Sequence, residues 1–330
     1  MFWEENKVMV DKYEKILKDF SAPRMAVYKN LLKSECGYKE ATNEQFYNLY
    51  SWSELLNSYF WRCLARVETI LRNRINDVLV AKIGSDWVFP KESDFLQISF
   101  RKKGNEAIEK ALSNITKADL RPNNGRIVAE LTMGFWVNFT EIRFLHKDSY
   151  KKDHRIGWEY FISDIFPGYT YPNDKPSEEY QRRFWLKEGN IKDNLVSKLI
   201  FLNILRNRIA HHEHTFKERN EFSKGLSDGF LTNIQRNYLN VLEVFRWLSP
   251  EQCDLYQRSH FHYYANYLMS KEGFDYHVLS KRKDMKIDDF TEIAMSSMDD
   301  SNLLRERVIH VVDKNDFPIG VFVPFFESQK

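Results

Sequence analysis

The amino-acid sequence predicts a mainly α-helical protein, on three observations. Glycine and proline, the residues that interrupt helices, number only 12 and 9 among 330 residues. Two long stretches, 41–82 and 191–212, contain neither of them. In the second stretch, apolar residues recur every three or four positions, which places them on one face of a helix. We expect these two stretches to form the main helices of a helical bundle.

The first predicted elements lead up to the longest helix. An amphipathic helix is expected over 5–20, and a short helix over 24–33. Between them Ser21 is a candidate N-cap, followed closely by a proline that breaks the first helix. The stretch 41–82 predicts one long helix, or two with a tight joint, ending at Gly84.

The middle of the chain alternates helices with turns. Helices are predicted over 104–118 and 127–144, separated by a strong turn at 121–125. The second helix contains Gly134, which costs about 1 kcal/mol relative to alanine in a helix. Close approach of a neighbouring helix would explain a glycine there. Residues 166–180 hold three prolines and predict a loop.

The character of the sequence changes near residue 252. A helix over 225–247 ends just before a proline. Further on, 308–312 and 319–323 carry β-branched, alternating runs with a turn between them, which predicts a β-hairpin. We therefore expect a helical domain over residues 1–252 and a small C-terminal α/β extension over residues 253–330.

Charge, cysteine content and hydropathy exclude several classes of protein. The net charge of +2 is not that of a dedicated DNA-binding protein. The three cysteines, Cys36, Cys63 and Cys253, form no CxxC pair or disulfide framework and fit a reducing compartment. Charges interrupt the N-terminal segment, so no signal peptide or anchor is expected. No stretch approaches the roughly 18 apolar residues of a membrane span. We expect a cytoplasmic protein with no membrane partner.

The segment 194–216 carries the candidate chemistry. On a helical wheel its leucines and Ile209 form one arc, and Arg206 lies in the middle of that arc. Asn207 and His211 are four residues apart and share a neighbouring face. Burying a guanidinium without a partner costs several kcal/mol. Arg206 therefore predicts a partner carboxylate, a subunit interface or an anionic ligand.

These residue types suit cleavage of RNA without a metal. The reaction needs a base for the 2′-hydroxyl proton, an acid for the leaving 5′-oxygen and a cation for the phosphorane. Imidazole titrates near neutral pH, so His211 suits either proton transfer. The Arg206 guanidinium binds phosphate with two donors and keeps its charge. Asn207 can orient the phosphate or the imidazole.

The string Arg206-Asn207-x-x-x-His211 resembles the R-N-x-x-x-H motif of the HEPN superfamily, which includes many toxin and antiviral ribonucleases. More of the chain, about residues 20–250, looks like the Abi family of bacterial abortive-infection proteins, a HEPN branch. The strings that carry this resemblance are SAPR at 21–24, LYSW at 49–52, VETILRN at 67–73, VAELTMGFWV at 128–137, LRNRIAHHE at 205–213 and WLSP at 247–250.

The resemblance implies a HEPN helical bundle that acts as a toxin or phage-defence endoribonuclease on an RNA substrate. It implies no metal and no cofactor, a homodimer in which two motifs form one cleft, and restraint by an RNA or protein antitoxin. The chain carries one full motif, because Arg72 is followed five residues later by Asp77 rather than histidine. Some HEPN toxins have tyrosine two positions after the motif histidine, where this chain has Glu213.

Six further residues are candidates for supporting roles. Glu68 and Arg72 are four apart and by default form an intrahelical pair, while Glu130 is a candidate carboxylate for Arg206 or Arg72. The full set is His212, Glu213, Glu68, Arg72, Asn73 and Glu130.

Metal ligation is not expected from the histidines. His211, His212 and His214 with Glu213 lack the HExxH spacing, and adjacent helical residues do not face one another. The other histidines without ligand spacing are treated as structural: His260, His262, His277 and His310.

Two other functions remain open. The same cleft would serve a non-catalytic RNA-binding module as an anion site. Alternatively, Arg206, Asn207 and His211 form a polar network that only fixes helix packing and dimer register.

Overall fold

The computed structural model describes most of the helical chain and two small sheets. The described residues are 12–89, 96–99, 102–118, 120–138, 143–146, 155–157, 162–169, 190–215, 229–280, 284–286, 288, 309–312 and 318–322. They divide into two compact units, each assembled from separate parts of the chain. The first unit comprises residues 1–61, 208–238 and 256–330, and the second comprises residues 62–207 and 239–255.

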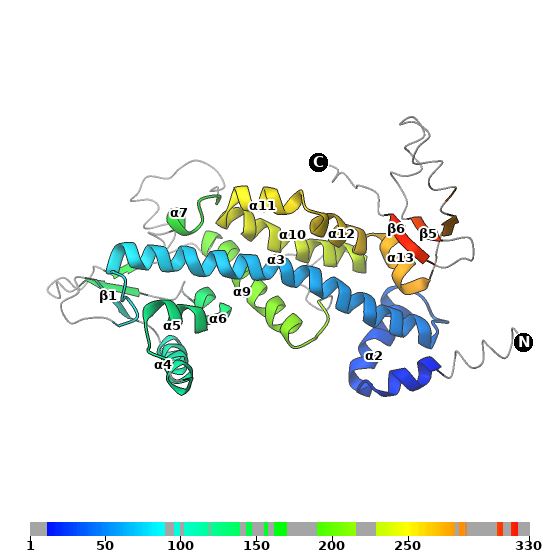
Figure 1. Cartoon of the computed structure of the whole chain (residues 1–330), viewed down its shortest axis with the longest axis horizontal. Helices are drawn as coiled ribbons and strands as arrows, with labels where there is room; N and C mark the ends of the chain where they lie inside the picture. Colours follow the sequence, from blue (N-terminus) through cyan, green and yellow to red (C-terminus); the bar gives the residue numbers. More distant parts are fainter. Residues whose placement is uncertain are drawn as a thin grey trace, which may run out of the picture. The chain divides into compact units, whose positions relative to one another are not determined.

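Four of the described helices pass from one unit to the other along the chain. They are α3 (Asn43–Ile83), α9 (Asn190–Ala210), α10 (Phe230–Leu248) and α11 (Pro250–Gln257), labelled in Figure 1. The predicted stretch 41–82 is therefore one continuous helix that begins at Asn43. The predicted stretch 191–212 is helical up to Ala210, and the predicted stretch 225–247 is helical from Phe230, after residues 225–228, which lie outside the described residues. Gly84, with φ of +123°, follows the end of α3, a conformation that glycine adopts without strain.

The first unit packs short helices against the N-terminal part of α3 (Figure 1). They are α2 (Ala22–Asn30), the π-helical turn η1 (Leu31–Glu35), α12 (His260–Leu268) and α13 (Lys271–Leu279).

Trp52 of α3 lies at the centre of the first unit. Its indole Nε1 donates to the carbonyl of Leu268 at 3.0 Å, and its ring packs edge-on against Phe274. Both polar and apolar parts of this large buried side chain are thereby satisfied.

The second unit gathers the remaining helices around the C-terminal part of α3 and around α9. They are α4 (Lys102–Lys117), α5 (Asn124–Glu130), α6 (Met133–Val137), α7 (Ile162–Ile165) and the first residues of α11 (Pro250–Gln257). Leucines and a valine with no more than 1% exposure form its core at Leu64, Val67, Leu71, Leu199, Leu202 and Leu205.

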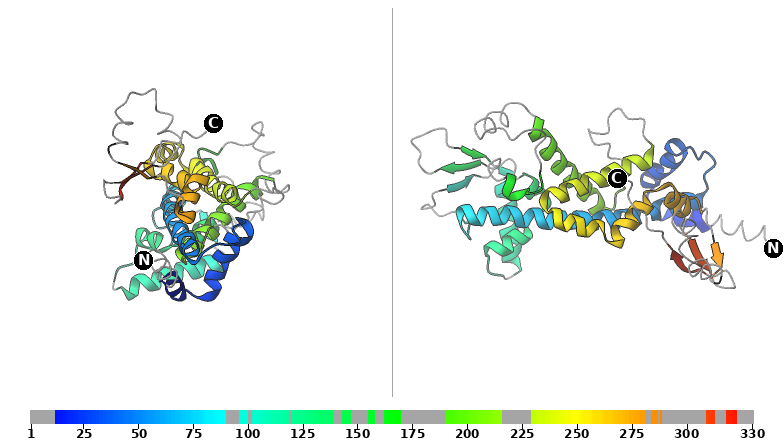
Figure 2. Two further views of the ribbon diagram at one scale, coloured as in Figure 1. Left: turned by 90° about the vertical axis from the view of Figure 1, so that its right-hand side faces the viewer. Right: turned by 90° about the horizontal axis from the view of Figure 1, so that it is seen from above.

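Each unit carries a three-stranded sheet, and both are visible in Figure 2. In the first unit, β5 (Ile309–Val312) pairs parallel with β4 (Asp284–Lys286) and antiparallel with β6 (Pro318–Phe322). The antiparallel pair confirms the predicted C-terminal hairpin. In the second unit β1 (Leu96–Ser99), β2 (Arg143–His146) and β3 (Arg155–Gly157) form an antiparallel sheet that the sequence analysis did not predict.

The predicted single helix over 127–144 is wrong. Leu131 and Thr132 are extended, with ψ of 131° and 164°, so α5 ends and α6 begins anew. The break is stabilised because the indole of Trp136 donates to the Leu131 carbonyl at 3.3 Å and the Phe135 amide donates to the Thr132 carbonyl at 2.9 Å. These bonds replace those of a continuous helix.

Smaller differences concern the N-terminal elements. Of the helix predicted over 5–20, residues 12–18 are helical and residues 19–20 are not, while residues 5–11 lie outside the described residues. Ser21 occupies the N-cap position of α2, but its side chain makes no capping hydrogen bond. Most of the predicted loop 166–180 also lies outside the described residues. The domain boundary near residue 252 stays a prediction.

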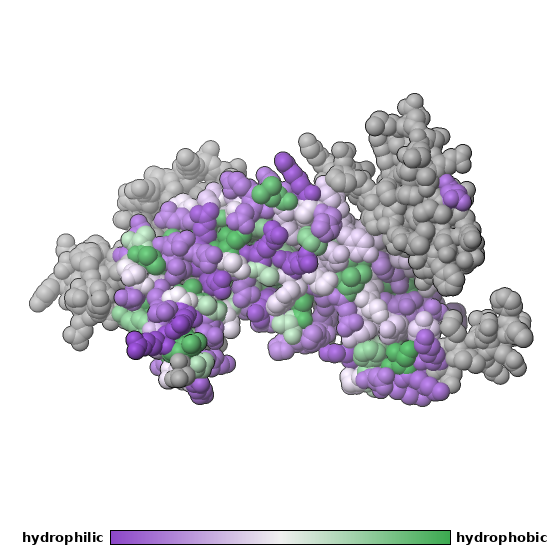
Figure 3. All heavy atoms as spheres, in the orientation of Figure 1, coloured by the Kyte–Doolittle hydropathy of each residue, from purple (hydrophilic) through white to green (hydrophobic). Residues whose placement is uncertain are grey.

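The surface face drawn in Figure 3 is mainly hydrophilic, with apolar side chains in small groups. Within the described ranges, no helix is both long enough and apolar enough to cross a membrane.

Candidate functional site

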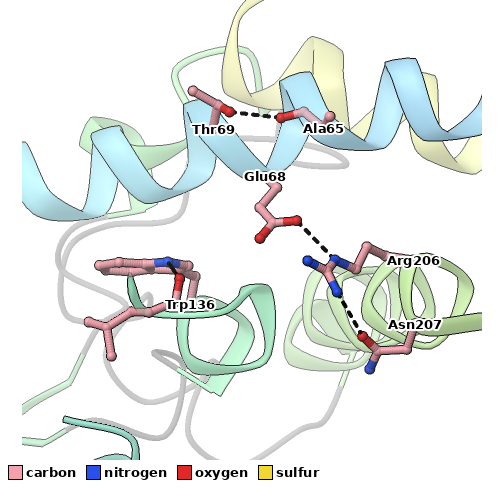
Figure 4. Close-up of polar contacts among 7 residues, drawn as sticks. Ala65, Glu68, Thr69, Trp136, Arg206 and Asn207 are labelled. Carbon is pink, nitrogen blue, oxygen red and sulfur yellow. Dashed lines mark hydrogen bonds and ion pairs between the residues drawn. The ribbon is translucent and has the colours of Figure 1, made fainter. Parts of the chain in front are cut away.

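Arg206 and Glu68 form an ion pair between two helices of the second unit. Arg206 extends from α9 toward Glu68 on α3, and its Nε donates to Oε2 of Glu68 at 3.1 Å (Figure 4). The two side chains are 26% and 21% exposed, so both charges are largely removed from water. This contact confirms that Arg206 meets a partner carboxylate. Glu68 therefore pairs with α9 and not, as the default interpretation had it, with Arg72.

Asn207 lies beside the guanidinium on its outer side. Nη1 of Arg206 approaches Oδ1 of Asn207 at 3.5 Å, a long and weak hydrogen bond (Figure 4). The Asn207 side chain is exposed. Glu68, Arg206 and Asn207 thus form a short polar row that runs from a half-buried carboxylate to the surface of α9.

The break between α5 and α6 brings α6 against α9 close to this row. A Cβ built on Gly134 would lie 3.7 Å from Nδ2 of Asn203 on α9. Gly134 therefore faces a neighbouring helix, but at an ordinary contact distance, so the expected close approach does not explain the glycine. Oδ1 of Asn203 is buried and has no hydrogen-bond partner among the described residues.

His211 follows directly after the end of α9, where the chain turns sharply. The amide of His212 donates to the Ile209 carbonyl at 2.9 Å, and that of Glu213 donates to the Arg208 carbonyl at 2.8 Å. These two bonds define a Schellman motif, which normally has glycine where this chain has His212. His212 accordingly has φ of +56°. A side chain in that conformation costs roughly 1–2 kcal/mol.

The segment 211–215, here called the histidine turn, is exposed on one side and buried on the other. His211, His212 and Glu213 are exposed, whereas His214 and Thr215 are 8% and 1% exposed. The buried half is fixed from α2 and α3, because the His214 ring packs edge-on against Tyr28 and Asn57 donates to the Glu213 carbonyl at 2.8 Å. The buried half of the turn therefore holds the backbone in place, and the two histidines His211 and His212 are exposed on the other side.

Of the other predicted supporting residues, Glu213 contacts α9 beside the motif, whereas Arg72, Asn73 and Glu130, at their described positions, form no hydrogen bond or ion pair with Arg206, Asn207 or His211. Glu213 forms an ion pair with Arg208 at 3.5 Å, across the end of α9. Arg72 is half-buried, and no acidic partner reaches it within the described residues. Asn73 and Glu130 are exposed, and Glu130 accepts from Asn114 at 3.4 Å rather than from an arginine. The guess that Glu130 holds Arg206 is therefore wrong, since Glu68 does.

Two residues of this region were missed by sequence reasoning. Asn57 and Asn237 are 8% and 2% exposed and donate to carbonyls of the histidine turn, at Glu213 and Thr215. Asn57 is a polar residue beside apolar positions of α3, since it lies three and seven positions before Phe60 and Leu64. That interruption is the same kind of signal that pointed to Arg206.

His262, also buried, forms a separate network in the first unit. Nδ1 of His262 lies 3.2 Å from the Tyr238 hydroxyl, and Nε2 lies 2.9 Å from Nδ2 of Asn266. Burial lowers the pKa of His262 to about 4, because the charged imidazolium is disfavoured away from water. In the described part of the chain, no group of three His, Cys, Asp or Glu side chains is placed to hold a metal ion.

Comparison with known proteins places the chain in a wider group. A family model described as Abi-like protein matches residues 15–217, which include α3, α9 and the histidine turn. No curated protein and no solved structure matches the chain.

Proposed function

Because the chain belongs to the family of Abi-like proteins, we propose that it is a metal-independent endoribonuclease of the HEPN type that acts in abortive infection. It would work as a toxin or phage-defence effector. Membership of the family is consistent with such a role. The observation that carries the proposal is the ion pair between Arg206 and Glu68. Arg206 lies on α9, and His211 follows directly after the last residue of that helix.

The proposed reaction is an internal transfer of the phosphate. His211 takes the proton of the ribose 2′-hydroxyl, and the 2′-oxygen attacks the adjacent phosphorus. The bond to the 5′-oxygen breaks, and that oxygen receives a proton from an imidazolium. The products are a 2′,3′-cyclic phosphate and a free 5′-hydroxyl. No oxidant, metal or cofactor enters this balance.

Arg206 stabilises the charge that builds up on the phosphate oxygens in this scheme. A guanidinium does so best when its direction is fixed before the substrate arrives. The bond from Nε to Glu68 at 3.1 Å provides that fixed direction. Asn207, exposed beside Arg206, orients the phosphate. Arg72, one helical turn beyond Glu68, supplies a second positive charge.

A second copy of the chain is the expected partner besides RNA. One chain holds one full motif, and two motifs would supply both a base and an acid. On α9, Ile200 and Ile204 are 47% and 40% exposed and lie on the same face as Asn207. An apolar stripe of this kind next to the motif suits a homodimer contact. Restraint by an RNA or protein antitoxin belongs to the same proposal.

The decisive experiment compares RNA cleavage by the wild type, His211→Ala and His260→Ala in excess EDTA. His260 is an exposed histidine outside the motif and provides the matched control. Wild type and His260→Ala should both leave 2′,3′-cyclic phosphate ends, while His211→Ala should leave RNA intact. Cleavage that stops in EDTA, or that survives in His211→Ala, would contradict the proposal.

The ion pair also keeps a structural alternative open. A half-buried pair can serve only to fix helix packing, and the polar row would then set dimer register. In that case Arg206→Ala lowers stability and leaves RNA untouched. A non-catalytic RNA-binding module would instead bind RNA equally well with and without His211, and cleave none.

A further inference from the structure

The histidine turn, residues 211–215, is held in a conformation that its own sequence disfavours. His212 has φ of +56°. Histidine is strained in this conformation, whereas glycine adopts it without strain. Strain of this kind persists only where surrounding contacts over-determine the backbone. The contacts that do so identify the residues on which the placement of His211 depends.

Asn57 is the central contact. Its Nδ2 donates to the Glu213 carbonyl at 2.8 Å, from a position on α3 that is 156 residues away in sequence. The amide of the same Glu213 donates to the Arg208 carbonyl and closes the Schellman motif. A shift of Glu213 would therefore open the motif and release His211 and His212, which lie between the end of α9 and Glu213.

A second amide acts on the far end of the turn. Nδ2 of Asn237 on α10 donates to the Thr215 carbonyl at 3.4 Å. Two asparagines from two different helices thus hold two carbonyls of a five-residue segment. Buried amides are costly unless they are hydrogen-bonded. Oδ1 of Asn57 lacks a donor within the described residues. Burying this amide therefore has a cost, which the bond from Nδ2 to the Glu213 carbonyl offsets.

We propose that Asn57 is a positioning residue for His211, with Asn237 as its counterpart at the other end of the histidine turn. Asn57 fixes the Glu213 carbonyl, and the closed Schellman motif then sets where the His211 and His212 rings project. This inference rests on the proposed function for its catalytic meaning. The positioning itself is a property of the backbone, and it can be measured without RNA.

The test uses the full chain and three variants. Asn57→Leu removes the donor but keeps a side chain of similar size. Gln235→Met is the matched control, because Nε2 of half-buried Gln235 donates to the Met269 carbonyl at 3.1 Å in the same unit and not to the turn. The third variant combines Asn57→Leu with His212→Gly, since glycine adopts a positive φ without strain.

Two readouts separate positioning from general stability. The first is hydrogen exchange of the His212 and Glu213 amides, which should speed up about tenfold or more in Asn57→Leu and stay unchanged in Gln235→Met. The second is single-turnover cleavage at saturating RNA. It should fall roughly ten- to hundredfold in Asn57→Leu, with RNA affinity retained, because displacing a reacting group by about 1 Å costs that much. Adding His212→Gly should restore amide protection.

Each outcome bears on one of the two proposals. A wild type that cleaves no RNA overturns the proposed function, while amide exchange still tests the positioning. A wild type that cleaves RNA, together with an Asn57→Leu variant that exchanges and cleaves as fast as the wild type, overturns the positioning. Equal losses in Asn57→Leu and Gln235→Met would also overturn it, because general destabilisation would then explain both.

Discussion

Glu68 and Arg206, 138 residues apart in sequence, are joined by a hydrogen bond of 3.1 Å between α3 and α9. Each side chain is about three-quarters buried. An ion pair at this depth holds its partners more firmly than a surface pair does, because water competes less for both groups. Its removal is therefore the first change to examine.

Replacing Glu68 with glutamine keeps an acceptor near Nε of Arg206 and removes the negative charge. We expect Glu68→Gln to lower the free energy of unfolding by about 1–2 kcal/mol, because a charged hydrogen bond becomes a neutral one. Urea denaturation measures this loss. RNA cleavage should fall about tenfold as the direction of Arg206 loosens. Glu130→Gln is the control, and an equal effect there would contradict the assignment.

Replacing His212 with glycine should stabilise the protein slightly. Removing the strain of the positive φ raises the free energy of unfolding by roughly 1–2 kcal/mol. The greater freedom of glycine in the unfolded chain lowers it by about 1 kcal/mol. We expect a small rise in Tm for His212→Gly. His211→Gly, one residue earlier and without a positive φ, should lower Tm. A fall in both variants would argue against the Schellman motif.

Acid should destabilise the first unit through His262. Burial lowers the pKa of His262 from 6.5 to about 4, so between these values the unfolded chain binds a proton that the folded chain does not. Stability is then complete above pH 6.5 and decreases toward pH 4, by an amount on the order of 3 kcal/mol. In His262→Gln, the free energy of unfolding should depend less on pH between 6.5 and 4 than it does in the wild type. The same dependence on pH in both proteins would refute the assignment.

Two glycines of the second unit should respond oppositely to alanine. A Cβ at Gly134 would meet Asn203 at an ordinary contact distance of 3.7 Å, so Gly134→Ala should be neutral or stabilising by up to about 1 kcal/mol. A Cβ at Gly168 would overlap the Arg246 carbonyl oxygen and lie 2.8 Å from Cγ of Pro250. Gly168→Ala should cost about 1–3 kcal/mol. Thermal unfolding of the two variants provides the comparison.

Much of the helical fold was predictable because its signals are local. Helical spacing and the lack of breakers located α3 and α9, and the β-branched runs located the hairpin of β5 and β6. The break at Leu131 and Thr132 was not predictable from spacing. It depends on a hydrogen bond from the Trp136 indole, and residues that are compatible with a helix flank it on both sides.

The site divides in the same way. An arginine in an apolar arc predicted a partner carboxylate, a subunit interface or an anionic ligand, and the first of these is present. Which carboxylate it would be could not be read from the sequence, because Glu68, Glu130 and others were equally available before the helices packed. The role of Asn57 depends on a contact across 156 residues, and nothing in its immediate neighbours encodes that distance.

The division of the chain between two units determines the order in which they are completed during synthesis. The second unit is complete once residue 255 has been made. The first unit, in contrast, needs Leu268 and Phe274 to cover Trp52. The histidine turn belongs to the first unit. Its surroundings are therefore completed after those of the Glu68–Arg206 pair, although His211 follows Arg206 by only five residues.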